Sequence, residues 1–280
     1  MGDPLASYTK EQFTHDGKTR DIYRKGEGPA VVVIAEIPGI TPKVIGFADR
    51  VVDIGCTAVL PHLFGEPGRD PYARGNAGAI GYTLKSIGPA CVARDFTVLA
   101  TGRTSPVIEW LKALARAEHE RCGGPGVGVI GMCFTGNFAL AMAVDDSVLA
   151  PVLSQPSLPF PVTKAKKRDL AISDADLDKV KARMKQDDDL CVLGMRFTSD
   201  RAVPKERFDR LREELGDRFV AVEIDSSKGN PWDIPRTAHS VVTENFVDEP
   251  GHPTRDALEK VLDLYRTRLL SGSGANPSAR

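Results

Sequence analysis

The stretch from Val127 to Leu140, VGVIGMCFTGNFAL, constrains the fold more than any other part of the chain. Its first residues are apolar and β-branched, which predicts a buried strand, and the run that begins at Phe138 predicts a helix. Between them stands Cys133, with Gly131 and Gly136 as small neighbours. A strand that leads into a helix through a small-x-nucleophile-x-small turn is a nucleophile elbow. Such an elbow lifts the cysteine above the sheet edge, where the helix N-terminus favours the reactive thiolate.

Two features of this stretch leave a second interpretation open. Thr135 stands where a glycine would be commoner in such an elbow. Free cysteines are also among the most buried residues of proteins, so Cys133 can be read as a small side chain in a tight turn. The elbow alone leaves both interpretations open.

The order of predicted elements indicates the fold class. Residues 11–24 alternate apolar and polar side chains around Asp16-Gly17, which predicts an antiparallel hairpin at the edge of the sheet. Apolar or mostly apolar runs predict strands at residues 29–35, 57–61, 127–130, 148–153 and 190–197, and a last strand is predicted at residues 218–224. Helical spacing predicts helices at residues 43–54, 105–122, 204–215 and 254–270. Strands that alternate with helices predict an α/β fold with a mostly parallel central sheet and helices on both faces.

One segment departs from this alternation. Residues 155–189 are proline-rich and then strongly charged, and Ser173 is placed to cap a helix that runs to about Gln186. We interpret this segment as an insertion, either a lid or a subunit contact. Residues 1–270 are then a single domain, and the Gly/Ser-rich residues 271–280 form a flexible tail.

Charge and cysteine content exclude several classes of protein. The net charge of -1 and the absence of a basic run give no attraction to nucleic acid or anionic lipid. No apolar run reaches the length needed to span a membrane, and the N-terminus has no secretory signal pattern. The five cysteines are scattered without a CxxC pair, which indicates neither a metal site nor a disulfide framework. We therefore expect a cytoplasmic protein.

Titratable residues follow several of the predicted strands. Glu36 comes directly after the run 29–35, and Asp200 comes just after the run 190–197. The loop after the last strand leads to His239. Because the carboxyl ends of parallel strands meet at one edge, where such sheets bind ligands, we expect these side chains to lie near Cys133. The alternative for Glu36 is a solvated loop residue, and His62, at the same edge, is better explained as structural.

The order Cys133, Asp200, His239 is the nucleophile–acid–histidine order of α/β-hydrolases. In such a triad the histidine accepts and returns protons, and the acid orients its ring. The N–H groups of Phe134 and Ile37 are the expected donors to an oxyanion. His252, which also precedes the C-terminal helix, is the competing choice for the histidine.

Residues 65–104 form a long irregular connection that contains several arginines. Connections of this kind are often functional, and arginines bind carboxylates by paired hydrogen bonds. Arg94 and Arg103 are therefore candidates to bind an anionic substrate.

Taken together, these stretches resemble the dienelactone hydrolase family over about residues 11 to 270. The resemblance is carried by Ala35-Glu36-Ile37, Gly131-Met-Cys-Phe-Thr-Gly136, Asp200-Arg-Ala-Val-Pro204 and Ala238-His239-Ser240. It implies an α/β-hydrolase fold, a Cys-His-Asp triad, no metal and no cofactor, and the opening of cyclic ester lactones. It also implies that Ile37 and Phe134 form the oxyanion hole. By resemblance, Glu36 contacts the resting cysteine and takes part in forming the thiolate when substrate binds.

The sequence also departs from the family. Thr135 replaces a glycine, the charged segment is longer than the usual connection, and no motif places the substrate-binding arginines. The resemblance therefore predicts the reaction class, hydrolysis of a small-molecule ester or lactone, better than it predicts the substrate. The charge of the substrate and the oligomeric state of the protein stay open. A cysteine amidotransferase would need a glutamate two residues after the histidine, and His239-Ser-Val lacks it. A non-catalytic binding protein on the same fold is the remaining alternative.

Overall fold

The computed structural model describes residues 2–75, 78, 81–82, 86 and 105–271. Arg94, Arg103 and the predicted tail from residue 272 lie outside the described residues. The described strands are β1 (Thr9–His15), β2 (Lys18–Lys25), β3 (Ala30–Ile34), β4 (Thr57–Pro61), β5 (Val127–Met132), β6 (Val148–Ser154), β7 (Val192–Phe197) and β8 (Phe219–Ile224). They form one sheet in the order β1-β2-β4-β3-β5-β6-β7-β8.

The predicted hairpin forms the antiparallel edge of this sheet. Strands β1 and β2 pair antiparallel, and β2 pairs antiparallel with β4. Asp16 and Gly17 both have positive φ, at 47° and 70°, as the tight two-residue hairpin turn requires. From β4 through β3 to β8 every pair is parallel, so the carboxyl ends of these strands lie at one edge. The mostly parallel sheet predicted from the sequence is confirmed.

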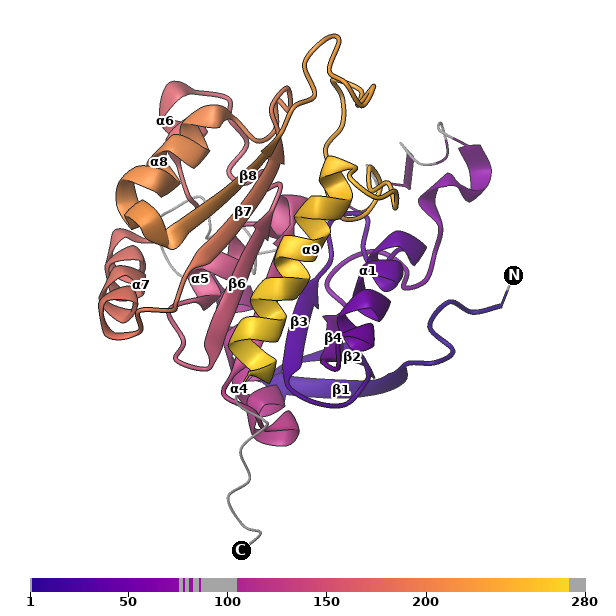
Figure 1. The fold of residues 1–280 in the computed structure, drawn as a ribbon. Coiled ribbons are helices and arrows are strands. Elements are labelled where there is room, and N and C mark those ends of the chain that lie inside the picture. Colours follow the sequence, from indigo (N-terminus) through magenta and orange to yellow (C-terminus); the bar gives the residue numbers. More distant parts are fainter. Residues whose placement is uncertain (1, 76–77, 79–80, 83–85, 87–104, 272–280) are drawn as a thin grey trace, which may run out of the picture.

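Helices cover both faces of the sheet (Figure 1). The described helices are α1 (Pro42–Asp53), α4 (Pro106–Cys122), α5 (Phe138–Met142), α6 (Lys164–Arg168), α7 (Asp174–Gln186), α8 (Lys205–Leu215) and α9 (Pro253–Tyr265). Helices α1 and α9 pack on one face, and α4, α5, α7 and α8 pack on the other. Strand β3 shows why the sheet separates two apolar layers. Its residues Val31 and Val33 belong to the α1 side, and Val32 and Ile34 belong to the α4 side.

Several predicted helix boundaries agree with the structure. Ser173 caps α7 by accepting a hydrogen bond from the backbone N–H of Asp176 at 3.1 Å. The C-terminal helix differs in one respect: the regular α-helix ends at Tyr265, and a wider π-helical turn follows over Arg266–Leu270.

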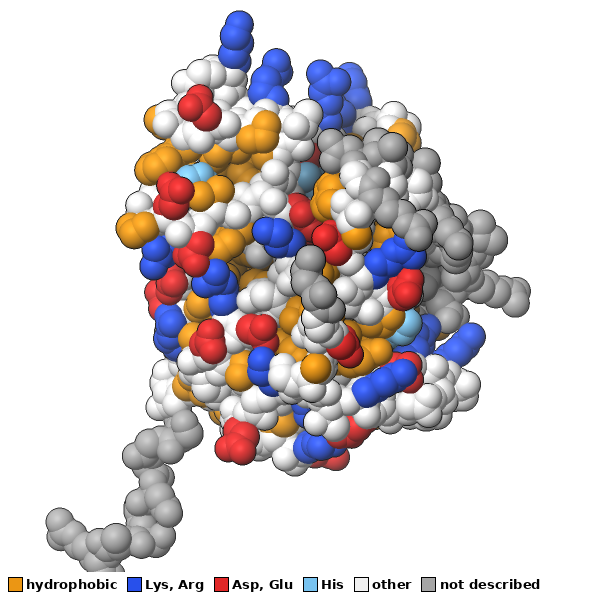
Figure 2. All heavy atoms as spheres, turned by 90° about the vertical axis from the view of Figure 1, so that its right-hand side faces the viewer, with side chains coloured by type: hydrophobic (Ala, Val, Ile, Leu, Met, Phe, Trp, Pro, Cys, Tyr) orange, Lys and Arg blue, Asp and Glu red, His pale blue; other side chains and the backbone are white. Residues whose placement is uncertain are grey.

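The surface carries charges of both signs. On the face drawn in Figure 2, acidic and basic side chains are interspersed among hydrophobic and neutral ones. In the described part of the chain, no helix combines the length and the apolar character that crossing a bilayer requires.

Candidate active site

The elbow forms as the sequence predicts. Strand β5 ends at Met132, a short 3-10 turn covers Cys133–Thr135, and α5 begins at Phe138. Cys133 has a φ of 53°, in the left-handed region that non-glycine residues rarely adopt. A Cβ on Gly131 would approach the Thr135 carbonyl oxygen to 2.1 Å, and one on Gly136 would approach Pro156 Cα to 2.4 Å. Both glycines are therefore required by close backbone contacts.

Thr135 has a role that its departure from glycine did not suggest. Its buried hydroxyl accepts a hydrogen bond from the backbone N–H of Met132 at 2.9 Å. The same hydroxyl lies 2.9 Å from the carbonyl oxygen of Ile34, to which it donates. Thr135 thus ties the elbow to the end of β3, the strand that leads to Glu36 and Ile37.

Asp200 and His239 are brought together from separate loops. Asp200 follows β7, and its Oδ2 lies 2.6 Å from Nδ1 of His239. The histidine loop is held by Asn245, whose side-chain oxygen accepts hydrogen bonds from the backbone N–H groups of His239 and Ser240 at 2.9 and 3.1 Å. The Asp200 side chain is buried, whereas the His239 ring remains partly exposed to the cavity described below.

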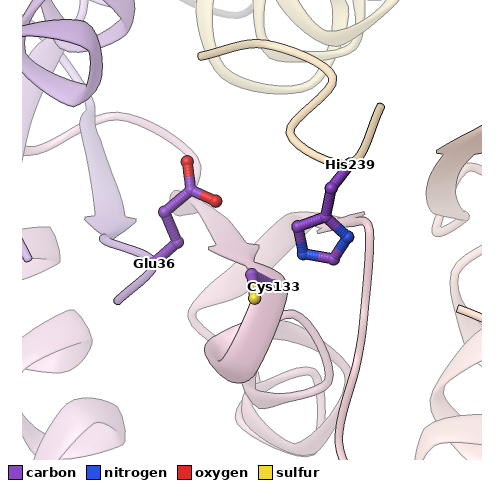
Figure 3. Close-up of side chains that lie close together, drawn as sticks. All are labelled: Glu36, Cys133 and His239. Atoms are coloured by element: carbon purple, nitrogen blue, oxygen red, sulfur yellow. The ribbon is translucent and has the colours of Figure 1, made fainter. Parts of the chain in front are cut away.

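Cys133, His239 and Glu36 converge from three different elements (Figure 3). The Cys133 sulfur, a His239 ring nitrogen and a Glu36 carboxylate oxygen all lie within 4.8 Å of one another. Burial lowers the pKa of His239, but the hydrogen bonds to Asp200 and Cys133 and the charges of both partners outweigh it and raise this pKa to about 11. The surroundings of His239 therefore favour its protonated imidazolium form next to the Cys133 sulfur.

Glu36 is 5% exposed, so its interpretation as a solvated loop residue is wrong. One carboxylate oxygen accepts hydrogen bonds from the Ser240 hydroxyl at 2.6 Å and from the Gln155 side-chain amide at 3.3 Å. The other accepts a hydrogen bond from the hydroxyl of Thr243. These three donors stabilise a buried carboxylate near the sulfur.

The three converging side chains open into a cavity of about 620 Å³. Its described walls are formed by Glu36, Ile37, Pro38, Thr41, Pro71, Tyr72, Cys133, Phe134, Ser157, Phe160, Thr237, His239, Ser240, Glu244 and Asn245. Ile37 and Phe134, the two residues predicted to form the oxyanion hole, both line this cavity. The described cavity is large enough for a small-molecule substrate next to Cys133.

The charged segment contributes to this cavity through its first residues. The Ser157 hydroxyl lies 3.4 Å from the Cys133 sulfur, and the Ser157 N–H donates to the Cys133 carbonyl at 3.0 Å. The segment is held by the fully buried Arg207 of α8, whose guanidinium donates to the carbonyls of Pro156 and Pro159 at 2.6 Å each. Burial lowers the pKa of Arg207 to about 10. Arg207 thereby fixes the backbone around Ser157.

The two other histidines considered from the sequence take structural positions. The His62 ring bonds the Gly65 carbonyl oxygen at 2.9 Å. His252 is buried at the start of α9, where its Nδ1 bonds the Thr254 hydroxyl at 2.7 Å. Neither is among the described cavity walls.

Sequence reasoning missed the residues that surround Glu36 and Cys133. Gln155 directly follows β6, so its strand-end position was a usable signal. Ser240 stands next to His239, but nothing in the sequence indicated its bond to Glu36. Ser157 and Thr243 lie in loops, and no sequence pattern linked them to the site.

The site also has the side-chain types of a metal site. A thiolate, an imidazole and a carboxylate are ligands that zinc takes in proteins. A cation bound there would occupy the Cys133 sulfur in the cavity wall.

A family model provides the deciding comparison, because the model of the dienelactone hydrolase family matches residues 22–232. The chain belongs to the dienelactone hydrolase family. The match covers the elbow, Glu36 and Asp200, and it ends just before His239. Family membership places the protein among the hydrolases.

Solved structures agree with this fold at low sequence identity. A candidate dienelactone hydrolase from Klebsiella pneumoniae subsp. pneumoniae superimposes with a TM-score of 0.58 at 16% identity, over 92% of this chain and 97% of the other. A dienelactone hydrolase-like promiscuous phosphotriesterase from metagenomic libraries gives 0.56 at 16% identity, over 94% and 98%. A cold-adapted esterase from an Arctic intertidal metagenomic library gives 0.55 at 14% identity, over 94% and 95%. No curated protein sequence matches the chain. The α/β-hydrolase fold is thus confirmed.

Proposed function

We propose that this member of the family hydrolyses ester or lactone bonds of small molecules with Cys133, His239 and Asp200 as a triad. The observation that carries the proposal is the 2.6 Å contact between Asp200 and His239, with a His239 nitrogen within 4.8 Å of the elbow sulfur. A nucleophile, a base and a group that orients the base form the arrangement required for acyl transfer.

The proposed reaction has two halves. The Cys133 thiolate attacks the carbonyl carbon, and the bond to the leaving oxygen breaks as that oxygen takes a proton from the His239 imidazolium. This leaves a thioester on Cys133. Water then attacks the thioester while neutral His239 takes a proton from it, and collapse of the tetrahedral intermediate releases the acid and the Cys133 thiolate. Asp200 keeps the ring in one orientation in both halves.

The oxyanion of each tetrahedral intermediate is assigned to the N–H groups of Phe134 and Ile37. Both residues line the cavity beside Cys133. Two donors aimed at the developing charge typically supply one of the largest contributions to such catalysis. The proposal also includes a cytoplasmic location, which is supported by the four cysteines of the described residues, all of them free thiols.

Labelling with a thiol reagent tests the proposal. Burial raises the pKa of Cys56 to about 11 and also raises the pKa values of Cys122 and Cys191. These three thiols should therefore react slowly at neutral pH. We expect one equivalent of iodoacetamide to remove esterase activity towards p-nitrophenyl acetate in proportion to the alkylation of Cys133, as measured by peptide mass spectrometry. Full alkylation of Cys133 with activity retained would exclude it as the nucleophile.

Glu36 is proposed to restrain the resting thiol. A buried carboxylate near the sulfur disfavours the thiolate by like-charge repulsion, in opposition to the imidazolium. Substrate binding would displace this contact. We expect Glu36→Gln to shift the pH profile of Cys133 alkylation to lower pH and to reduce the turnover number. Alkylation and turnover that both match wild type would remove Glu36 from the mechanism.

A further inference from the structure

The Glu244 carboxylate differs from the other carboxylate in the cavity. Glu36 is compensated by three hydrogen-bond donors. Glu244 also lines the cavity and is partly buried, but among the described residues its carboxylate makes no hydrogen bond or ion pair. Burial and the charge of Glu36 raise its pKa. A partly buried carboxylate without a partner gains most from a positive charge placed next to it.

Two aromatic residues also line this cavity. Tyr72 is 49% exposed and Phe160 is 47% exposed, although both are large hydrophobic side chains. Burial raises the pKa of Tyr72, and the charges of Glu244 and Glu36 raise it further. The tyrosine ring therefore lies within the field of both carboxylates. Aromatic faces next to a carboxylate are the chemical combination that binds ammonium groups.

The basic residues near this cavity lie outside its described walls. No lysine or arginine is among the described residues that line the cavity. Lys43 is close enough for its charge to lower the pKa of Glu244, but it is exposed and outside the cavity walls. Arg201 and Arg236 line a separate hollow of about 500 Å³ beside Asp200. Thr237 borders both spaces, so among the described residues the arginines nearest to the cavity are those of this second hollow.

We propose that the cavity selects esters that carry a positively charged ammonium group, with Glu244 as the residue that determines this specificity and with Tyr72 and Phe160 as the aromatic surfaces that contact the cation. That the substrate is an ester rests on the proposed function. The preference for a positive charge rests on Glu244. It opposes the anionic substrate for which Arg94 and Arg103 were candidates.

Three p-nitrophenyl esters of equal acyl length test the preference, with a trimethylammonium, a tert-butyl or a carboxylate end. In the wild-type enzyme we expect kcat/KM to fall in that order. We expect Glu244→Gln to lower the ratio of kcat/KM for the cationic over the anionic ester by about tenfold or more, because one partly screened charge contact is worth about that factor. The matched control is Glu249→Gln, which removes the same charge from an exposed side chain outside the described cavity walls and should leave the ratio unchanged.

A wild-type enzyme that prefers the anionic ester would overturn the inference, and loss of that preference in Arg236→Ala would locate the charged end in the second hollow. A ratio that Glu244→Gln leaves unchanged would also overturn it. If none of the three esters is hydrolysed, the result contradicts the proposed ester hydrolysis and leaves the charge preference to be tested by binding. Calorimetric binding of benzyltrimethylammonium to Cys133→Ala, with and without Glu244→Gln, then still decides the charge preference: binding that weakens on loss of Glu244 supports it, and absent or unaffected binding refutes it.

Discussion

Cys133→Ala should lower kcat/KM for ester hydrolysis by about 10³-fold or more, because the covalent step then has no nucleophile. This corresponds to about 4 kcal/mol of lost transition-state stabilisation. The fold should persist, because the cysteine side chain is only partly buried and alanine keeps the small volume that the elbow requires. Initial rates on an aryl ester, together with the free energy of unfolding in urea, measure both expectations.

The matched control for this variant is Cys191→Ala. Cys191 is also partly buried and unpaired, but it lies outside the described cavity walls. We expect this variant to keep wild-type turnover. Turnover near the wild-type value in Cys133→Ala would exclude the triad mechanism and would favour a binding protein on a hydrolase fold.

The strand-end residues were predictable from the sequence because the topology of a parallel sheet places them. Glu36 follows a continuous apolar run, and Asp200 follows a mostly apolar run that contains Arg196. Both runs form parallel strands whose carboxyl ends meet at one edge. The position of Cys133 follows from the same rule together with the small residues of the elbow. Local patterns were therefore sufficient to bring these side chains to one edge.

The contacts between loops were not predictable, because they depend on backbone paths that no local pattern specifies. Ser157 lies next to Cys133 in a backbone stretch that Arg207, some fifty residues later, holds by binding the carbonyls of Pro156 and Pro159. The bond between Thr243 and Glu36 likewise joins residues that are far apart in the sequence. An arginine in a charged helix carries no signal that its side chain will be fully buried.

Thr135 shows how a departure from a motif can be misjudged. Replacement of a glycine by threonine lowers the match to the elbow pattern, because the pattern records only the need for small side chains. The structure shows that the threonine hydroxyl bonds Met132 in the elbow and Ile34 at the end of β3. The threonine therefore fits because its hydroxyl bonds backbone N–H and C=O groups. A motif that records only side-chain size does not detect such bonds.

His239→Ala should also lower kcat/KM by about 10³-fold, but the effect should not add to that of Cys133→Ala. Each residue acts only through the other, because the histidine pairs with the thiolate and the thiolate is the group that attacks. We expect the double variant to be within about threefold of Cys133→Ala alone, since residues that act as one unit show strongly non-additive losses. Steady-state rates of the wild type, the two single variants and the double variant form the required cycle.

The pH dependence of stability gives a second readout for the same histidine. The pKa of His239 is raised from 6.5 to about 11 in the folded protein, so folding stabilises its protonated form. This contribution to the free energy of unfolding is fully present below pH 6.5 and is lost as the pH rises through about 11. We therefore expect the difference in the free energy of unfolding between wild type and His239→Ala to shrink over that range. A larger catalytic loss in His252→Ala than in His239→Ala would transfer the role of general base to His252, although its ring bonds Thr254 and lies outside the described cavity walls.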